Sequence, residues 1–263
     1  MLGNTAFNFF KKGLLNEGTL PRYRKINRIN FVLSDNIYTA DWNGTSIKFY
    51  TSETKDLGRA KTCGKEPMTE KWIDSFNSED VFWDIGANVG VYSLYAAFRV
   101  GCKVFSFEPV YHNYNILNRN IAINNMGENI TAYCFSLHDK FEIDKIHLRN
   151  LYSGSSGSDF SIKSNETSFS QGSLGFPIDD LVDHIAFPNH IKIDVDGNEK
   201  FIVKGMSKTL SNDNLKSVLI EINQSYESII DIFKEKGYKI FNKALLQVLD
   251  DGNKTINYIF KKS

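Results

Sequence analysis

The chain has 263 residues, 41% of them hydrophobic, which fits one large α/β domain or one domain with a small appendage. Its 31 lysines and arginines are balanced by 31 acidic residues, so bulk charge provides no general attraction for nucleic acid. We therefore expect no nucleic-acid partner. No apolar run approaches the length of a membrane span.

The cysteines and the N-terminus indicate the compartment. The three cysteines are widely separated and form no metal-type pair, and the first twelve residues lack the order of a secretory signal. These features predict a cytoplasmic protein without a structural metal site. The oligomeric state is left open.

The first 65 residues are predicted to form an N-terminal extension that contains a β-hairpin. Segments 37–42 and 45–51 are rich in β-forming residues and flank Asn43-Gly44, a dipeptide typical of two-residue hairpin turns. Residues 66–263 are predicted to form the main domain, which begins with a short helix over 66–76.

An alternation of strands and helices begins at Val81 and predicts a mostly parallel sheet with helices on both faces. The tail adds antiparallel pairing, because two strands flank Asp251-Gly252. The predicted strands are 81–85, 103–107, 130–135, 190–194, 217–222, 238–241, 246–249 and 255–260, and the predicted helices are 89–98, 111–124, 199–210 and 226–236.

An insertion of about 139–189 interrupts this alternation. Its central part, 153–173, is rich in serine and glycine. Such a stretch inside a domain is either a mobile lid or disordered, and we predict disorder.

The segment 81–90 has the pattern of a nucleoside-binding turn, since an apolar strand runs through Asp84 into a glycine turn and a helix. Gly86 lets the backbone turn tightly and approach a ligand. The N–H groups at the start of the helix suit a carboxylate or phosphate. Glu108 closes the next strand, where a carboxylate can accept hydrogen bonds from both ribose hydroxyls.

Dinucleotides and S-adenosylmethionine both use this arrangement, and Asp84 favours the second. The turn lacks the third glycine of the dinucleotide fingerprint. An acid here would repel a pyrophosphate but attract the ammonium and sulfonium of S-adenosylmethionine. Alternatively, Asp84 caps the helix and the glycines serve packing alone. Ser136 and Leu137, after the third strand, could contact an adenine or form an ordinary polar turn.

A second cluster of acids lies where the strand 190–194 passes into a helix. Asp194 and Asp196 are predicted to face the transferred methyl group, with Asp194 the first choice as base for an acceptor hydroxyl and Asp196 the second. The acids could instead hold Mg²⁺ or Ca²⁺, which we do not predict. Asp196 and Glu199 could also cap the helix, and Glu199 is interpreted in this way. Glu221 is a further candidate for the pocket rim.

These motifs together resemble the FkbM family of S-adenosylmethionine-dependent methyltransferases. The resemblance rests on Glu66-Pro67, on residues 84–90, on Phe107-Glu108-Pro109, and on residues 193–199 followed by Lys204-Gly205. It departs from the family at Asn198, where a small residue is usual, and the insertion has no clear family pattern.

The resemblance implies a Rossmann-like class I methyltransferase fold, with a seven-stranded sheet that is parallel except for an antiparallel C-terminal strand. It also implies O-methylation, with sugar residues and macrolide hydroxyls among the family's substrates. Because Asp194 matches the family's motif, the resemblance also implies that it is an active-site acid. The predicted cofactor-binding residues are Asp84, Gly86, Ala87, Asn88, Gly90, Glu108, Pro109, Ser136 and Leu137.

Our leading hypothesis is therefore an S-adenosylmethionine-dependent methyltransferase that O-methylates a hydroxyl of a sugar, a glycoconjugate or another secondary metabolite. The alternatives are an NAD(P)-dependent oxidoreductase and a non-catalytic protein that keeps the cofactor fold.

Overall fold

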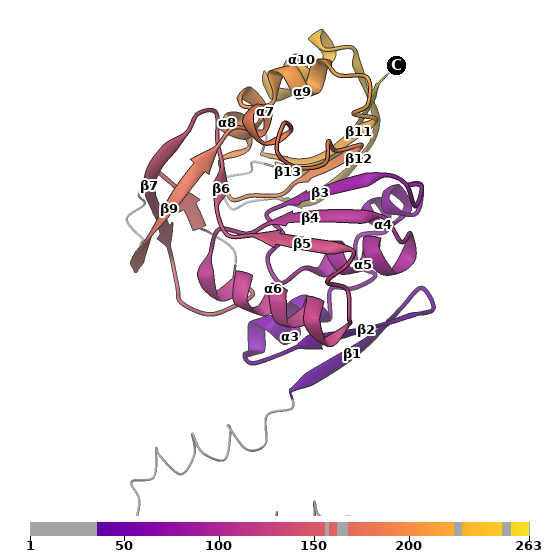
Figure 1. Cartoon of the computed structure of the whole chain (residues 1–263), viewed down its shortest axis with the longest axis vertical. Coiled ribbons are helices and arrows are strands. Elements are labelled where there is room, and N and C mark those ends of the chain that lie inside the picture. Colours follow the sequence, from indigo (N-terminus) through magenta and orange to yellow (C-terminus); the bar gives the residue numbers. More distant parts are fainter. Residues whose placement is uncertain (1–35, 156–157, 162–167, 224–227, 249–253, 263) are drawn as a thin grey trace, which may run out of the picture. The chain divides into compact units, whose positions relative to one another are not determined.

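The computed structural model describes residues 36–155, 158–161, 168–223, 228–248 and 254–262 (Figure 1). The first part of the chain contains β1 (Ile37–Trp42), β2 (Thr45–Tyr50), α3 (Thr54–Ala60), α4 (Pro67–Ile73), β3 (Val81–Ile85), α5 (Val91–Arg99), β4 (Lys103–Phe107), α6 (Tyr111–Ile123), β5 (Ile130–Tyr133) and β6 (Ser136–Leu137). The second part contains β7 (Glu142–Leu148), β8 (Ser158–Phe160), β9 (Phe169–Phe176), α7 (Ile178–Leu181), β10 (His190–Ile193), α8 (Glu199–Lys204), α9 (Ser207–Ser211), β11 (Ser217–Asn223), α10 (Ser228–Glu235), β12 (Tyr238–Val248) and β13 (Lys254–Lys262).

The main sheet has seven strands in the order β12-β13-β11-β10-β3-β4-β5. Strands β5, β4, β3, β10 and β11 pair in parallel, whereas β13 is antiparallel to both of its neighbours. This confirms the predicted sheet with an antiparallel C-terminal strand. The chain fills one side with β3, β4 and β5 and then returns to start β10 beside β3, so the strand order reverses between these two strands.

Two hydrophobic cores cover the two faces of the sheet, because side chains of a strand alternate between faces. Phe82 of β3 packs with α4, α5 and α6, and Trp83 and Ile85 pack in the other core, which α7 to α10 cover. Helices therefore lie on both faces, as predicted (Figure 1).

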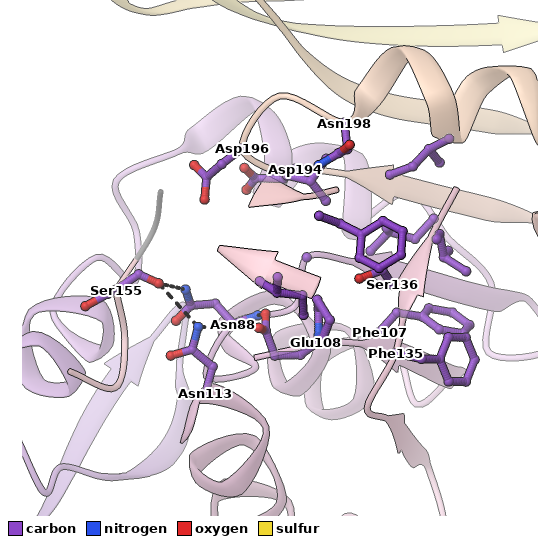
Figure 2. Close-up of a pocket in the computed structure, with 18 of the residues that line it drawn as sticks. Asn88, Phe107, Glu108, Asn113, Phe135, Ser136, Ser155, Asp194, Asp196 and Asn198 are labelled. Atoms are coloured by element: carbon purple, nitrogen blue, oxygen red, sulfur yellow. Dashed lines mark hydrogen bonds between the residues drawn. The ribbon is translucent and has the colours of Figure 1, made fainter. Parts of the chain in front are cut away.

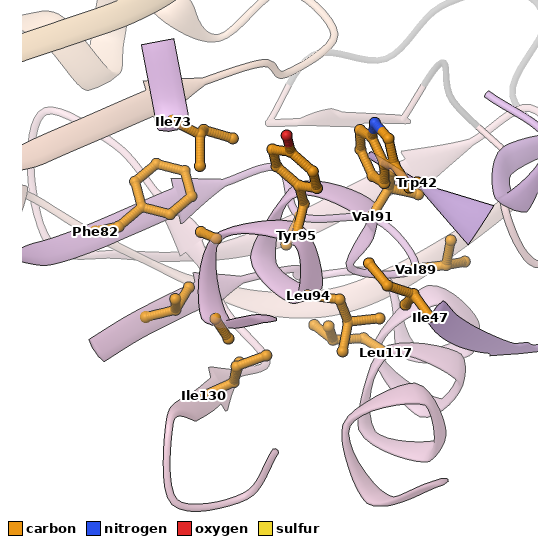
Figure 3. Packing of buried hydrophobic residues seen from close by; sticks show 14 of the residues in the cluster. Trp42, Ile47, Ile73, Phe82, Val89, Val91, Leu94, Tyr95, Leu117 and Ile130 are labelled. Atoms are coloured by element: carbon orange, nitrogen blue, oxygen red, sulfur yellow. The ribbon is translucent and has the colours of Figure 1, made fainter. Parts of the chain in front are cut away.

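The N-terminal hairpin packs on the outer side of α5 (Figure 3). The Trp42 ring stacks on Tyr95 with 4.1 Å between ring centroids, and Ile47 is fully buried in the same core. The side-chain amide oxygen of Asn120 in α6 accepts a hydrogen bond from the Tyr50 backbone N–H at 2.6 Å. The predicted hairpin is present, and its apolar face completes the core of the sheet domain. The boundary that we placed at residue 65 stays a prediction.

The insertion is more ordered than its composition predicts. Strands β6, β9, β7 and β8 form a second sheet in that order, with β9 antiparallel to β7 along the whole of β7. The prediction of disorder for 153–173 is therefore wrong for 158–160 and 169–173, while 156–157 and 162–167 lie outside the described residues. Within this small sheet Phe160 packs closely against Gly175, where a Cβ would lie 2.8 Å from its ring.

Other elements also differ from the prediction. Helix α3 was not predicted, and strands 238–241 and 246–249 are one continuous strand, β12. The helix predicted over 199–210 is two helices that break at Gly205. A Cβ at this position would lie 2.2 Å from the His138 carbonyl oxygen, so only glycine fits at the break. The first two residues of the helix predicted over 226–236, and the turn Asp251-Gly252, lie outside the described residues.

A buried polar chain ties the amino ends of β3, β10 and β11 together, opposite the end where the pattern predicts the site. The His190 ring nitrogens lie 3.2 Å from Asp80 Oδ2 and 2.7 Å from Ser217 Oγ, which also accepts a hydrogen bond from Trp72 Nε1. Lys216 pairs with the other oxygen of Asp80. These contacts link the amino ends of three neighbouring strands through buried side chains.

This buried histidine predicts a loss of stability in acid. Burial lowers the pKa of His190 to about 4. An unfolded histidine takes up its proton near pH 6.5, so between these values the unfolded chain binds more protons and stability falls as the pH falls. We expect the free energy of unfolding to be about 2 kcal/mol lower at pH 5 than at pH 7 from this residue alone.

The measurement is urea unfolding at both pH values for the wild type and two variants. His190→Gln should lose most of the difference, and the exposed His184→Gln should keep it. An undiminished difference in His190→Gln would assign the acid sensitivity to other groups.

Candidate cofactor and active site

A pocket opens at the carboxyl ends of β3, β4 and β10, where the strand order reverses. Ligands of open α/β sheets bind at such switch points. The pocket contains about 760 Å³ of space, including a mouth open to solvent. Eight of the predicted site residues line it, and Figure 2 shows several of them facing a common space: Gly86, Asn88, Glu108, Pro109, Ser136, Leu137, Asp194 and Asp196.

Gly86 lets β3 and β10 approach each other at the base of the pocket. Its φ is 78°, a left-handed conformation that residues with a Cβ rarely adopt. A Cβ at this position would lie 1.9 Å from the carbonyl oxygen of Asp194. The glycine is required by both backbone conformation and space.

Glu108 presents a buried carboxylate at the centre of the pocket (Figure 2). Its Oε2 accepts a hydrogen bond from the Asn88 N–H at 2.8 Å, and its Oε1 accepts one from the Val110 N–H at 3.0 Å. Burial raises the pKa of Glu108 to about 7, although these hydrogen bonds favour the charged form. The side chain is fixed in orientation and keeps lone pairs that can accept the two hydroxyls of a ribose.

One end of the pocket is apolar and suits a flat ring. Phe107, Phe135 and Leu137 line it together with residues from the small sheet and α8. Two buried oxygens of the pocket lining, Ser136 Oγ and Asn198 Oδ1, have no hydrogen-bond partner among the described residues. Unpaired buried polar atoms are destabilising, so these two suit the polar edge of a bound base.

The structure does not place Asp84 on the pocket surface. Its side chain points to the α5 face of the sheet, where Oδ2 accepts a hydrogen bond from Ser93 Oγ at 2.5 Å and Oδ1 lies 3.9 Å from Lys192 Nζ. Burial raises the pKa of Asp84, and the Lys192 charge opposes part of that rise. Asp84 thus lies beneath the turn instead of in the pocket wall. Ala87 and Gly90 are likewise absent from the lining residues.

Asp194 and Asp196 lie together at the edge of the pocket, as predicted (Figure 2). Lys192 Nζ donates to Asp194 Oδ2 at 2.6 Å, and the lysine side chain is only 3% exposed. Burial alone would raise the pKa of Asp194, but the charge and hydrogen bond of Lys192 outweigh it and hold the pKa below its usual value. Asp194 is therefore a charged, oriented carboxylate.

Glu221 lies on β11 directly after Ile220, which pairs with Ile193, so that it stands beside Asp194. Burial, and then the charge of Asp194, raise the pKa of Glu221 to about 8. Within the described residues no group of three or more histidine, cysteine or acidic side chains is placed to hold a metal ion.

Sequence reasoning missed four polar residues of the pocket, namely Arg59, Asn113, Ser155 and Asn198. Ser155 belongs to the serine-rich insertion, and its carbonyl accepts hydrogen bonds from the side chains of Asn88 and Asn113 at 3.0 and 3.3 Å (Figure 2). Asn198 carried a signal, since it departs from the family pattern. No local pattern marks Arg59, because it comes from a helix outside the strand–helix alternation.

The order of the seven strands and a pocket at the switch point define a Rossmann-like class I methyltransferase fold. The profile of the methyltransferase FkbM domain matches residues 84–240. The chain therefore belongs to the FkbM methyltransferase family.

The individual proteins that resemble this chain share little sequence identity with it, as three examples show. The hexuronic acid methyltransferase AglP of Haloferax volcanii is 24% identical over 196 residues, which are 70% of this chain and 73% of that protein. The precorrin-6y C5,15-methyltransferase of Geobacter metallireducens superposes with a TM-score of 0.47 and 13% identity, over 80% of this chain and 90% of that one. The tRNA m1G37 methyltransferase of M. jannaschii has a TM-score of 0.49 and 13% identity, over 88% and 58%.

Proposed function

We propose that the protein uses S-adenosylmethionine to O-methylate a hydroxyl of a sugar or glycoconjugate. The main observation in support of this cofactor is the position of the Glu108 carboxylate at the end of β4. It lies in a pocket with an apolar slot on one side and acids on the other. Three acids line the pocket, namely Glu108, Asp194 and Asp196. Such a lining attracts a cationic sulfonium and ammonium, whereas it would repel the pyrophosphate of a dinucleotide. The oxidoreductase hypothesis is therefore not favoured.

The chain offers partners for the adenine and the ribose of this cofactor. Phe107, Phe135 and Leu137 would enclose the adenine, and the unpaired oxygens of Ser136 and Asn198 would accept hydrogen bonds from its edge. Glu108 would bind the ribose hydroxyls. When bound, S-adenosylmethionine supplies an electrophilic methyl group for in-line displacement.

Asp194 is positioned to bind and deprotonate the acceptor hydroxyl. It would accept a hydrogen bond from the acceptor hydroxyl and align its oxygen with the methyl carbon. As the new C–O bond forms and the C–S bond breaks, the hydroxyl proton becomes strongly acidic. A carboxylate with a lowered pKa can then take it, and Lys192 keeps that carboxylate in place.

The sugar acceptor is supported by family membership and by the relative named as a hexuronic acid methyltransferase. The test is transfer of labelled methyl from S-adenosylmethionine to a panel of neutral and acidic saccharides, with the product linkage read by NMR. A methyl ether on a sugar oxygen is expected. Absence of transfer to every saccharide, with transfer to another class of metabolite, would contradict the acceptor assignment.

Cofactor binding should depend on pH through Glu108. If the ionised form binds the ribose, a pKa of about 7 predicts that affinity for S-adenosylmethionine rises about tenfold from pH 6 to pH 8. Glu108→Gln should bind more weakly at both pH values and lose this rise. Calorimetric titration of both proteins across the range measures it, and an equal rise in the variant would assign the dependence to another group.

A further inference from the structure

The glycine turn leaves the carboxylate of the cofactor without an obvious partner. The N–H groups of Gly86 and Ala87 both donate to the Phe107 carbonyl, and that of Gly90 donates to the Ala87 carbonyl. The two between them donate to side chains, Asn88 N–H to Glu108 and Val89 N–H to the Asn88 side chain. All five donors of the turn are therefore used inside the protein, and the amides that we expected to bind a carboxylate are not available.

Arg59 is the only positively charged side chain among the described residues that line the pocket. It lies on α3, before the sheet domain in the sequence, and the described part of the chain gives it no ion pair within 4 Å. Its Nε donates to the Gly154 carbonyl at 2.9 Å. This hydrogen bond uses only Nε. The two Nη groups have no hydrogen-bond partner in the described part of the chain.

The contact with Gly154 fixes the position of the arginine. The Gly154 N–H donates to the side chain of Asn113 at 2.8 Å, and a Cβ on Gly154 would lie 2.9 Å from the backbone of Lys55 in α3. Lys55 Nζ also donates to Ser155 Oγ at 3.0 Å. The helix and the insertion thus hold each other at the pocket mouth. A guanidinium held in this way loses little freedom when it binds a planar anion.

We infer that Arg59 binds the methionine carboxylate of S-adenosylmethionine through its free Nη groups, so that helix α3 completes the cofactor site. The inference rests on the proposed function. The charges agree with it, because Asp194 and Asp196 would face the sulfonium and ammonium while Arg59 faces the single negative group of the same ligand. The charge of Arg59 reaches that end of the pocket, since it helps to lower the pKa of Asp194.

Decarboxylated S-adenosylmethionine tests the inference, because it keeps the sulfonium and ammonium and lacks only the carboxylate. Calorimetric titration of Arg59→Gln should show about 10- to 100-fold weaker binding of S-adenosylmethionine than in the wild type. Binding of the decarboxylated ligand should change by less than about twofold. Arg59→Lys should restore part of the affinity for the intact cofactor, and Lys61→Gln, which removes a charge from the exposed end of α3, should bind both ligands as the wild type does.

Each other outcome has a distinct meaning. Equal weakening of both ligands by Arg59→Gln would show that the residue only supports the pocket mouth, and would overturn the inference. Unchanged cofactor affinity with a raised KM for an acidic saccharide would overturn it in favour of a carboxylate on the acceptor. Failure of the wild type to bind S-adenosylmethionine would overturn the proposed function and this inference together.

Discussion

Gly86→Ala should be the most destabilising single substitution in the pocket, lowering the free energy of unfolding by about 4 kcal/mol or more. The new methyl carbon would lie 1.9 Å from the Asp194 carbonyl oxygen, which is backbone and has no flexible end to move. Relief would require β3 and β10 to separate at the switch point. Urea unfolding followed by tryptophan fluorescence measures the loss.

Gly101→Ala is the matched control for this substitution. Gly101 has nearly the same φ, 79°, but a Cβ there would meet nothing within 4 Å. Its destabilisation should be about 1–2 kcal/mol, the strain of a left-handed backbone alone. If the two variants were equally stable, the close approach of Gly86 to β10 would not be a feature of the protein.

Asp194→Asn should lower kcat for methyl transfer about 100-fold or more, because the amide can orient the acceptor hydroxyl but cannot take its proton. The variant keeps an oxygen toward Lys192 Nζ, so the buried lysine retains a hydrogen-bond acceptor at the position now 2.6 Å away. The affinity for S-adenosylmethionine should change by less than about tenfold. Steady-state rates with a saccharide acceptor and calorimetric titration of the cofactor measure both quantities.

Asp196→Asn supplies the comparison, since Asp196 lies at the same edge of the pocket but is exposed. We expect its kcat to fall by less than about tenfold. A larger loss in Asp196→Asn than in Asp194→Asn would transfer the role of base to Asp196. Equal rates in all three proteins would exclude both carboxylates.

The sheet and its switch point could be predicted from the sequence, because β3 and β10 are short segments rich in apolar residues with acids and glycines at or just after their ends. The periodicity of hydrophobic residues and the residue types at turns are local properties of the sequence. They place Gly86, Glu108 and Asp194 at the carboxyl edge of the sheet without knowledge of the tertiary fold. The alternation of side chains along β3, with Trp83 and Ile85 on one face, also determines that Asp84 points toward α5.

The rest of the site depends on contacts between distant segments. Arg59 and Ser155 are 96 positions apart in numbering, and they line the same pocket because Gly154 packs on the backbone of α3. The strands of the insertion gain their stability by pairing with each other and by burying Phe160 and Ile146, which no local pattern signals. The sequence does not show that the amides of the glycine turn are occupied, because three of them donate to Phe107 and Glu108 at the end of β4, and the other two donate within the turn itself.

Titration of the purified protein with S-adenosylmethionine at pH 8, beside Glu108→Ala and beside NAD⁺, tests the cofactor assignment most directly. We predict one site per chain with micromolar affinity, about 100-fold weaker binding by Glu108→Ala, and no binding of NAD⁺. Binding of NAD⁺ in preference to S-adenosylmethionine, or equal binding of S-adenosylmethionine by the wild type and Glu108→Ala, would contradict it.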